Sequence, residues 1–152
     1  MELTTKIHIA RPEDIPAILE IAKASFPDPW TEALFRQTLE QNSAPFWCAG
    51  DGNRVLGYLV LSFCGDAVSI DDIAVHPAYR RHGIAGQLLN HAIQAYPDRE
   101  FWLEVRQSNL SAIRLYHSFG FLQTGLRRRY YQNPAEDAIL MTKNSKIMIN
   151  RE

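Results

Sequence analysis

A short segment rich in small residues carries the clearest chemical signal in the chain. It follows the apolar residues Ile73, Ala74 and Val75, and its members are Arg80, Arg81, His82, Gly83, Ile84, Ala85 and Gly86. The pattern predicts a strand, a turn and the start of an amphipathic helix. The first backbone N–H groups of a helix have no partner within it and lie at the positive end of its dipole, so they attract anions. The guanidinium groups of Arg80 and Arg81 add positive charge in a geometry that suits phosphate. We therefore expect this segment to bind a pyrophosphate.

Two common types of phosphate loop do not fit the segment. The chain lacks the Gly-Lys-Ser/Thr of a Walker loop, and it lacks Gly-x-Gly-x-x-Gly at the end of a first strand. What remains is Arg-x-x-Gly-x-Ala at residues 80–85, which resembles the acetyl-coenzyme A loop of the GCN-related N-acetyltransferases (GNAT). The resemblance implies acetyl-coenzyme A as co-substrate. It also implies that the backbone of residues 73–75 follows the pantetheine arm and that residues 81–86 surround the pyrophosphate.

A second group of residues suited to chemistry lies in a predicted strand and the helix after it. In the run 101–106, Trp102, Glu104 and Arg106 alternate with apolar residues and share one face. Desolvation beside a tryptophan would make a carboxylate a stronger base. Tyr116 lies at the edge of the apolar stripe of the next helix, where its hydroxyl could reach a cleft. The alternatives are a solvated Glu104–Arg106 pair and a core tyrosine with a satisfied hydroxyl.

The run from Trp102 to Met141 resembles the bacterial ribosomal-protein-alanine N-acetyltransferases within that family. The matching pieces are Trp-Leu-Glu-Val-Arg, Ser-Asn, Ala-Ile-x-Leu-Tyr, Arg-x-Tyr-Tyr and Asp-Ala-Ile-x-Met. The resemblance implies a general base at Glu104, a general acid to the thiolate at Tyr116 and a cofactor contact at Asn109. It also implies a wall around the first residues of a peptide, formed by Tyr130 and Tyr131. The implied reaction is direct transfer of acetyl, in a ternary complex, to the N-terminal amine of a ribosomal protein that begins with alanine.

The chain departs from the family pattern at two positions that bear on this reaction. Asp72 stands where asparagine is common, which adds a charge near the expected substrate face. Asp72 is therefore a candidate substrate contact, and Asp72 or Asp71 could share the role of base. His82 replaces a usual arginine and would weaken phosphate contact near neutral pH. For the arginines at 127–129, protection of an edge strand from aggregation is an equal alternative to a role beside the substrate peptide.

The acidity of the amine favours an α-amine substrate. An α-amino group titrates near 7.7–8.0, so roughly a third of it is neutral at pH 7.5, whereas lysine, near 10.4, leaves about one part in a thousand neutral. Two other functions stay open. One is acetylation of a small amine such as a polyamine, amino acid or drug, which an acidic cleft at Asp71 and Asp72 would favour. The other is a non-catalytic binder of acetyl-coenzyme A, which has no need for both Glu104 and Tyr116.

The predicted elements form an α/β (α+β) domain with the GNAT order β-α-α-β-β-β-α-β-α-β-β. About seven strands would make a mixed, mostly antiparallel sheet with helices on both faces. Helices are expected after Pro12, after Thr31, after the phosphate loop and after Asn109, the last ending at Gly120. The predicted strands cover residues 7–10, 45–49, 54–63, 67–75, 101–106, 121–131 and 138–142.

Length and composition agree with one globular domain. The chain has 152 residues, 46% of them hydrophobic and 22% charged, with a net charge of −1. We expect a single domain over residues 1–143, a tail over 144–152, and no nucleic-acid or membrane partner. Cys48 and Cys64 are predicted to be buried free thiols, and no apolar leader precedes residue 7, so a reducing cytoplasm is expected. The five histidines lack metal-ligand spacing, which predicts no metal.

Overall fold

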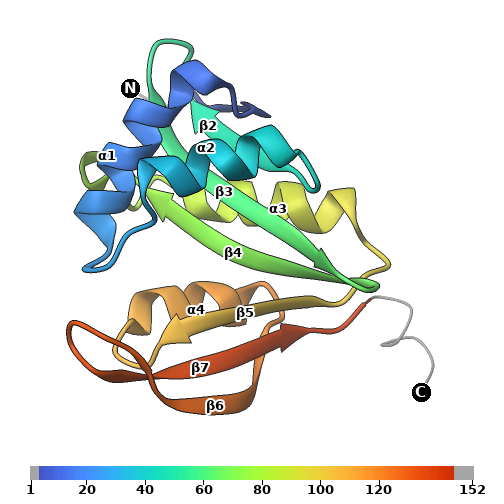
Figure 1. Ribbon diagram of the computed structural model, residues 1–152. Helices are drawn as coiled ribbons and strands as arrows, with labels where there is room; N and C mark the ends of the chain where they lie inside the picture. The colour runs from blue at the N-terminus through green and yellow to red at the C-terminus, as the bar shows by residue number, and fades with distance from the viewer. Residues whose placement is uncertain (1–3, 146–152) are drawn as a thin grey trace. The chain divides into compact units, whose positions relative to one another are not determined.

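One mixed sheet of seven strands organises the chain, as predicted from the sequence (Figure 1). The computed structural model describes residues 4–145. The strand order is β1-β2-β3-β4-β5-β7-β6, with β4 and β5 parallel. In chain order, with η marking a 3-10 turn, the elements are β1 Lys6–Ile9, η1 Pro12–Asp14, α1 Ile15–Ser25, α2 Glu32–Gln41, β2 Phe46–Gly50, β3 Val55–Cys64, β4 Ala67–Val75, η2 Pro77–Tyr79, α3 Ile84–Ala95, β5 Phe101–Arg106, α4 Leu110–Ser118, β6 Leu122–Tyr131 and β7 Glu136–Lys143.

The predicted boundaries agree best for the strands that carry the candidate site. β4 and β5 have the predicted limits, and the other strands differ by one or two residues at their ends. The two 3-10 turns were absent from the prediction. Pro12 begins η1, and α1 begins afterwards with Pro16 in its first turn, where a missing N–H costs nothing. Most of the expected tail, from position 146 onward, lies outside the described residues, and so do residues 1–3.

The chain forms two compact units, and the first holds the predicted phosphate loop. It consists of the residues up to Leu61 together with Asp72–Leu89. Phe35 of α2 is fully buried and packs against Phe46 and Tyr58, with ring centroids 6.2 and 5.5 Å away. The helix that carries Phe35 begins at Thr31, whose side chain accepts a hydrogen bond from the N–H of Leu34 at 3.1 Å, as predicted.

The face of β3 opposite to Tyr58 packs against the first part of α3. A Cβ at Gly57 would lie 3.1 Å from Ile84, 3.4 Å from Leu88 and 3.1 Å from the carbonyl oxygen of Ala74. A larger residue at position 57 would push the helix or the neighbouring strand back by a few tenths of an ångström, so glycine favours this close approach. The close approach fixes the start of α3, and with it the segment that precedes the helix.

The second unit holds the predicted acid and base. Among the described residues, it consists of Ser62–Asp71 and residues 90–145. Val68 and Ile70 of β4 lie opposite Phe101 and Leu103 of β5 in parallel register. β5 alternates buried and accessible residues, so one face packs inward and the other carries Trp102, Glu104 and Arg106. Antiparallel β7 lies beside β5, and β6 forms the edge of the sheet.

One expectation about the cysteines is wrong. Cys48 is buried as predicted, but Cys64 is exposed. Cys64 is the last residue of β3 and precedes the turn at Gly65, so it extends past the packed part of the strand. Within residues 4–145, none of the helices has both the length and the apolar character required to cross a membrane.

Candidate active site

The predicted phosphate loop connects η2 to α3 through left-handed backbone. Arg81 has φ of 68° and Gly83 has φ of 76°. The carbonyl oxygen of Gly83 accepts the first helical hydrogen bond, from the N–H of Gln87 at 2.9 Å. The N–H groups of residues 84–86 precede this bond and have no carbonyl partner inside the helix. The loop therefore presents a row of N–H donors at the positive end of α3, which fits a pyrophosphate.

The two arginines of the loop have different surroundings. Arg80 donates from Nε to the carbonyl oxygen of Val75 at 3.3 Å and from its terminal nitrogen to Oγ of Ser25 at 3.1 Å. Its guanidinium therefore joins β4 to the last turn of α1. Arg81 is exposed and has no hydrogen bond or ion pair with any residue between 4 and 145. Of the two predicted phosphate contacts, Arg81 has the freer charge.

A chain of polar contacts fixes η2, the element before the loop. Arg54 forms an ion pair with Asp51 at 2.8 Å, hydrogen-bonds the hydroxyl of Tyr79 and stacks over its ring at 4.8 Å. The hydrogen bond from Arg54, followed by backbone hydrogen bonds, lowers the pKa of Asp51 to about 2. The ring of His82 lies 6.5 Å from that of Tyr79. The turn between β2 and β3 is thus tied to the entrance of the loop.

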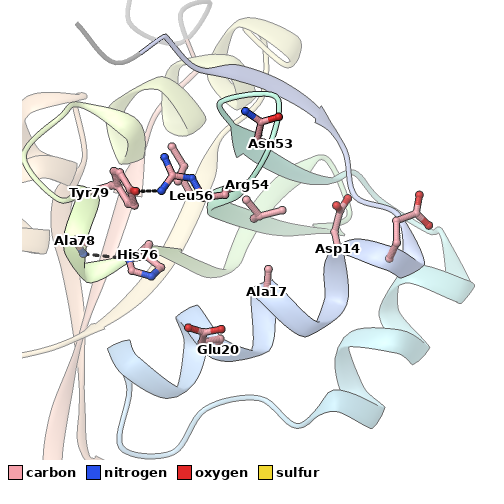
Figure 2. A pocket seen from close by; sticks show the side chains of 11 residues that line it. Asp14, Ala17, Glu20, Asn53, Arg54, Leu56, His76, Ala78 and Tyr79 are labelled. Carbon is pink, nitrogen blue, oxygen red and sulfur yellow. Dashed lines mark hydrogen bonds between the residues drawn. The ribbon is translucent and has the colours of Figure 1, made fainter. Parts of the chain in front are cut away.

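A pocket of about 490 Å³ lies beside these contacts. Figure 2 shows the side chains that line it: Ala17 and Glu20 of α1, Arg54 in the turn before β3, His76 before η2 and Tyr79 in η2. None of the site residues predicted from the sequence is among its lining residues. Sequence reasoning missed the pocket because its members come from separate elements and share no motif.

Asp72, the predicted substrate contact, is buried in the first unit. Its side chain accepts a hydrogen bond from the hydroxyl of Tyr58 at 2.9 Å, and only 8% of the residue is exposed. Burial, followed by the charge of Asp72, raises the pKa of Tyr58. Asp71 is exposed and accepts from Oγ of Ser69 at 2.7 Å. Ile73, Ala74 and Val75 continue β4 towards the loop, and Ala74 and Val75 are buried.

Glu104 lies on the accessible face of β5 in the second unit. Its Oε1 is 3.5 Å from the guanidinium of Arg127, and the Glu104 side chain is 30% exposed. The negative charge of Glu104, followed by burial and a hydrogen bond with Glu104, raises the pKa of Tyr130. Arg127 also stacks over the ring of Tyr130, with its guanidinium carbon 5.4 Å from the ring centre. The carboxylate therefore has the cation of Arg127 and the phenol of Tyr130 as neighbours, and its charge also acts on the phenol of Tyr131.

Tyr131, the second predicted wall residue, is held by another arginine. Arg106 stacks over its ring at 4.5 Å and forms an ion pair with Glu136 at 3.2 Å. Arg106 also donates to the carbonyl oxygens of Gln132 and Pro134, at 2.7 and 3.0 Å, which anchors the turn between β6 and β7. Burial and then the charge of Glu104 raise the pKa of Tyr131 to about 12. The Glu104–Arg106 pair, which was the alternative to a general base at Glu104, is absent from the ion pairs of residues 4–145.

Tyr116 lies in α4, and Asn109 is the residue that caps the start of this helix. Tyr116 is 7% exposed, and its ring packs against Phe121 at 5.9 Å. Tyr116 also has a further interaction partner in the structure. Its burial and its contacts therefore agree with the alternative of a core tyrosine. The side-chain oxygen of Asn109 caps α4 by accepting from the N–H of Ala112 at 3.3 Å, as its position before the helix predicted.

Arg127 is the site residue that sequence reasoning missed. Strict alternation along a strand places Arg127 and Tyr130 on opposite faces, because they are three positions apart. The register shows why both lie beside Glu104: β6 advances from Arg127 to Tyr131 while β7 advances only from Ala138 to Glu136. The extra residues form a bulge, where Arg129 has φ of 51°. A positive φ at arginine has no clear sequence signal, so the bulge was not predictable.

Residues 15–121 match the model of the acetyltransferase (GNAT) family. The chain belongs to the GNAT family. Two curated relatives of this acetyltransferase are N-acetyltransferases. The [ribosomal protein bS18]-alanine N-acetyltransferase of Escherichia coli is 35% identical over 133 residues, which cover 84% of this chain and 89% of that protein. N-alpha-acetyltransferase RimI of Mycobacterium tuberculosis is 35% identical over 122 residues, which cover 78% of this chain and 77% of that protein.

The fold of the acetyltransferase agrees with that of a solved relative. The crystal structure of the ribosomal-protein-alanine N-acetyltransferase from Escherichia coli matches with a TM-score of 0.84 at 31% sequence identity, over 92% of this chain and 93% of that chain. The resemblance inferred from the motifs is therefore confirmed, and so is the GNAT fold. The chain is an N-acetyltransferase.

Proposed function

We propose that the chain transfers acetyl from acetyl-coenzyme A to the N-terminal α-amine of a ribosomal protein that begins with alanine. The observation that carries the proposal is the group of Glu104, Tyr130 and Tyr131 in the second unit, a carboxylate beside two phenols. The relatives with more than 30% identity include enzymes named for the alanine of ribosomal protein bS18. The matching motifs of this chain span the same carboxylate and phenols.

The phosphate loop of the first unit supports acetyl-coenzyme A as the acetyl donor. Backbone N–H groups of residues 84–86 and the free charge of Arg81 would hold its pyrophosphate. The backbone of Ile73, Ala74 and Val75 would lie along the pantetheine arm. Bound acetyl-coenzyme A supplies the activated acetyl group, and backbone N–H groups near Val75 would polarise its carbonyl.

Proton movements are proposed for the second unit. Glu104 would accept the proton of the attacking amine, directly or through a water, and Tyr116 would return a proton to the departing thiolate. Direct transfer in a ternary complex needs no covalent link to the enzyme. We propose one catalytic domain over residues 1–143, acting in the cytoplasm, where ribosomal proteins are made.

The test is thiol release from acetyl-coenzyme A in the presence of a short peptide that begins with alanine. The same peptide with a blocked N-terminus and no lysine is the control. Release that depends on the free N-terminus is expected. Glu104→Gln should bind acetyl-coenzyme A normally and lose turnover, whereas a variant with normal turnover would remove Glu104 from the mechanism.

The alternative of a small-amine substrate loses its main support. That alternative depended on an acidic cleft at Asp71 and Asp72, and Asp72 is buried against Tyr58. Failure of the peptide, together with release by a polyamine or an amino acid, would nevertheless restore it. Binding of acetyl-coenzyme A without turnover on any amine would indicate the non-catalytic binder.

A further inference from the structure

We propose that Arg127 sets the amine selectivity of this enzyme by neutralising the field of Glu104, so that neutral α-amines are accepted and lysine side chains are disfavoured. The inference rests on the proposed role of Glu104 as the base. It concerns a residue of the edge strand β6 for which the sequence offered only a general role against aggregation.

The contacts of Arg127 identify a specific partner. Its guanidinium lies 3.5 Å from Oε1 of Glu104, and the same group stacks over Tyr130 at 5.4 Å. Ala138 of β7 lies directly opposite Arg127 and is fully buried, and Leu140 of the same strand lies opposite Glu104. The long side chain of Arg127 therefore reaches across β7 over a small residue to meet the carboxylate.

The stacking fixes the charge in place. An arginine on an aromatic face loses less freedom on pairing than a free side chain, because the planar group is already oriented. The charge of Glu104 raises the pKa of Tyr130, and the Tyr130 ring carries the guanidinium of Arg127, so the three groups form one cluster. The neighbouring Arg128 has no such contact: no hydrogen bond or ion pair joins it to any residue in the described range 4–145.

The charge balance of this cluster decides which amines are favoured. A lone carboxylate attracts cations, and a lysine side chain is almost always a cation at neutral pH. With Arg127 beside it, the carboxylate belongs to a pair with no net charge, and an approaching ammonium meets a guanidinium about as close as the carboxylate. An α-amine avoids this repulsion by binding through its neutral fraction, which is roughly a third of the amine at pH 7.5.

The size of the effect follows from the exposure of the pair. The two side chains are 56% and 30% exposed, so a water-like dielectric is appropriate. A unit charge about 5 Å from an ammonium in such a medium changes its binding by about fourfold. The relative use of lysine over α-amine should therefore rise about three- to fivefold when the charge of Arg127 is removed.

The experiment compares wild type, Arg127→Gln, Arg127→Lys and the matched control Arg128→Gln. Two probes are used: a lysine-free peptide with a free N-terminal alanine, and the same peptide N-terminally acetylated with a single internal lysine. The ratio of their kcat/KM values is measured at low and at high salt. Arg127→Gln should shift the ratio towards lysine, and Arg127→Lys should keep it near wild type. High salt should reduce the difference, because the charges are exposed.

An unchanged ratio in Arg127→Gln, or an equal change in Arg128→Gln, would overturn the inference. An equal loss of kcat/KM on both probes would also overturn it, because it would mean that Arg127 only maintains the structure. If Arg127→Gln proves inactive, the wild-type ratio at rising salt decides: a constant ratio would count against the inference. Failure of the proposed function is distinct, since wild type would then release no thiol with the alanine peptide.

Discussion

A methyl group added at Gly83 should weaken acetyl-coenzyme A binding without slowing the chemical step. Gly83 has φ of 76°, and a Cβ added there meets no atom within 4 Å. The substitution Gly83→Ala therefore changes backbone preference alone. Left-handed backbone costs a non-glycine residue about 1–2 kcal/mol. We expect the free loop of the variant to relax and avoid this strain, whereas the arrangement of N–H donors proposed to bind pyrophosphate requires the positive φ at position 83.

The strain therefore opposes binding by the same amount. Since 1.4 kcal/mol corresponds to a factor of ten, the affinity for acetyl-coenzyme A should fall by about 5- to 30-fold. The assay is thiol release with varied acetyl-coenzyme A, which should show a raised KM at an almost unchanged kcat, supported by direct titration calorimetry.

Gly65→Ala is the matched control for this substitution. Gly65 also has positive φ, 59°, and open space where a Cβ would lie, but it belongs to the turn between β3 and β4. This variant should carry a similar strain and keep the wild-type KM. The reasoning would be refuted if Gly83→Ala bound acetyl-coenzyme A within twofold of wild type, or if Gly65→Ala weakened binding equally.

Three further predictions concern stability and reactivity. Tyr58→Phe removes the hydroxyl that donates to the buried carboxylate of Asp72. The free energy of unfolding, measured by urea titration, should fall by about 1.5–3 kcal/mol. A loss below about 0.5 kcal/mol would contradict this prediction. Cys64 should react with a thiol reagent at pH 8 in the native protein while Cys48 does not, because burial raises the pKa of Cys48 to about 12; equal labelling would exclude that burial. Asp51 has a pKa lowered to about 2 by the hydrogen bond from the arginine of its own turn, so its contribution to stability is complete above about pH 4 and disappears as the pH falls towards 2. The difference in urea midpoint between wild type and Asp51→Asn should therefore narrow as the pH falls from about 4 to 2. A constant difference over this pH range would contradict the lowered pKa.

The fold was largely predictable because local signals agree with one another. Thr31 and Asn109 cap their helices through side-chain oxygens, and Gly120 has the positive φ expected after a helix. Such signals depend on a few neighbouring residues, so a single sequence displays them. The alternation along β5 likewise indicated which face carries Glu104. The start of α1 was missed because η1 and α1 form consecutive turns with a proline in each.

The motifs named the candidate site residues, but they did not indicate the contacts that these residues make. Long side chains can reach several partners, and their choice depends on register and on bulges. Arg80 bonds to Ser25, which lies 55 positions earlier in the chain, and Arg127 meets Glu104 across an intervening strand. The sequence did not indicate that Asp72, a predicted substrate contact, accepts a hydrogen bond from Tyr58. These outcomes depend on tertiary packing, which a motif does not contain.

The hydrogen bond between Arg80 and Ser25 links the predicted phosphate loop to the last turn of α1. Oγ of Ser25 in turn donates to the carbonyl oxygen of Ile21 at 2.7 Å, so the last turn of α1 and the loop share one hydrogen-bonded chain. Anything that orders the loop should therefore restrain the end of this helix. Amide hydrogens in the last turn of α1 should exchange with deuterium more slowly when acetyl-coenzyme A is added, and Arg80→Ala should abolish that slowing. Unchanged exchange in the wild type would show that the helix end and the loop fluctuate independently.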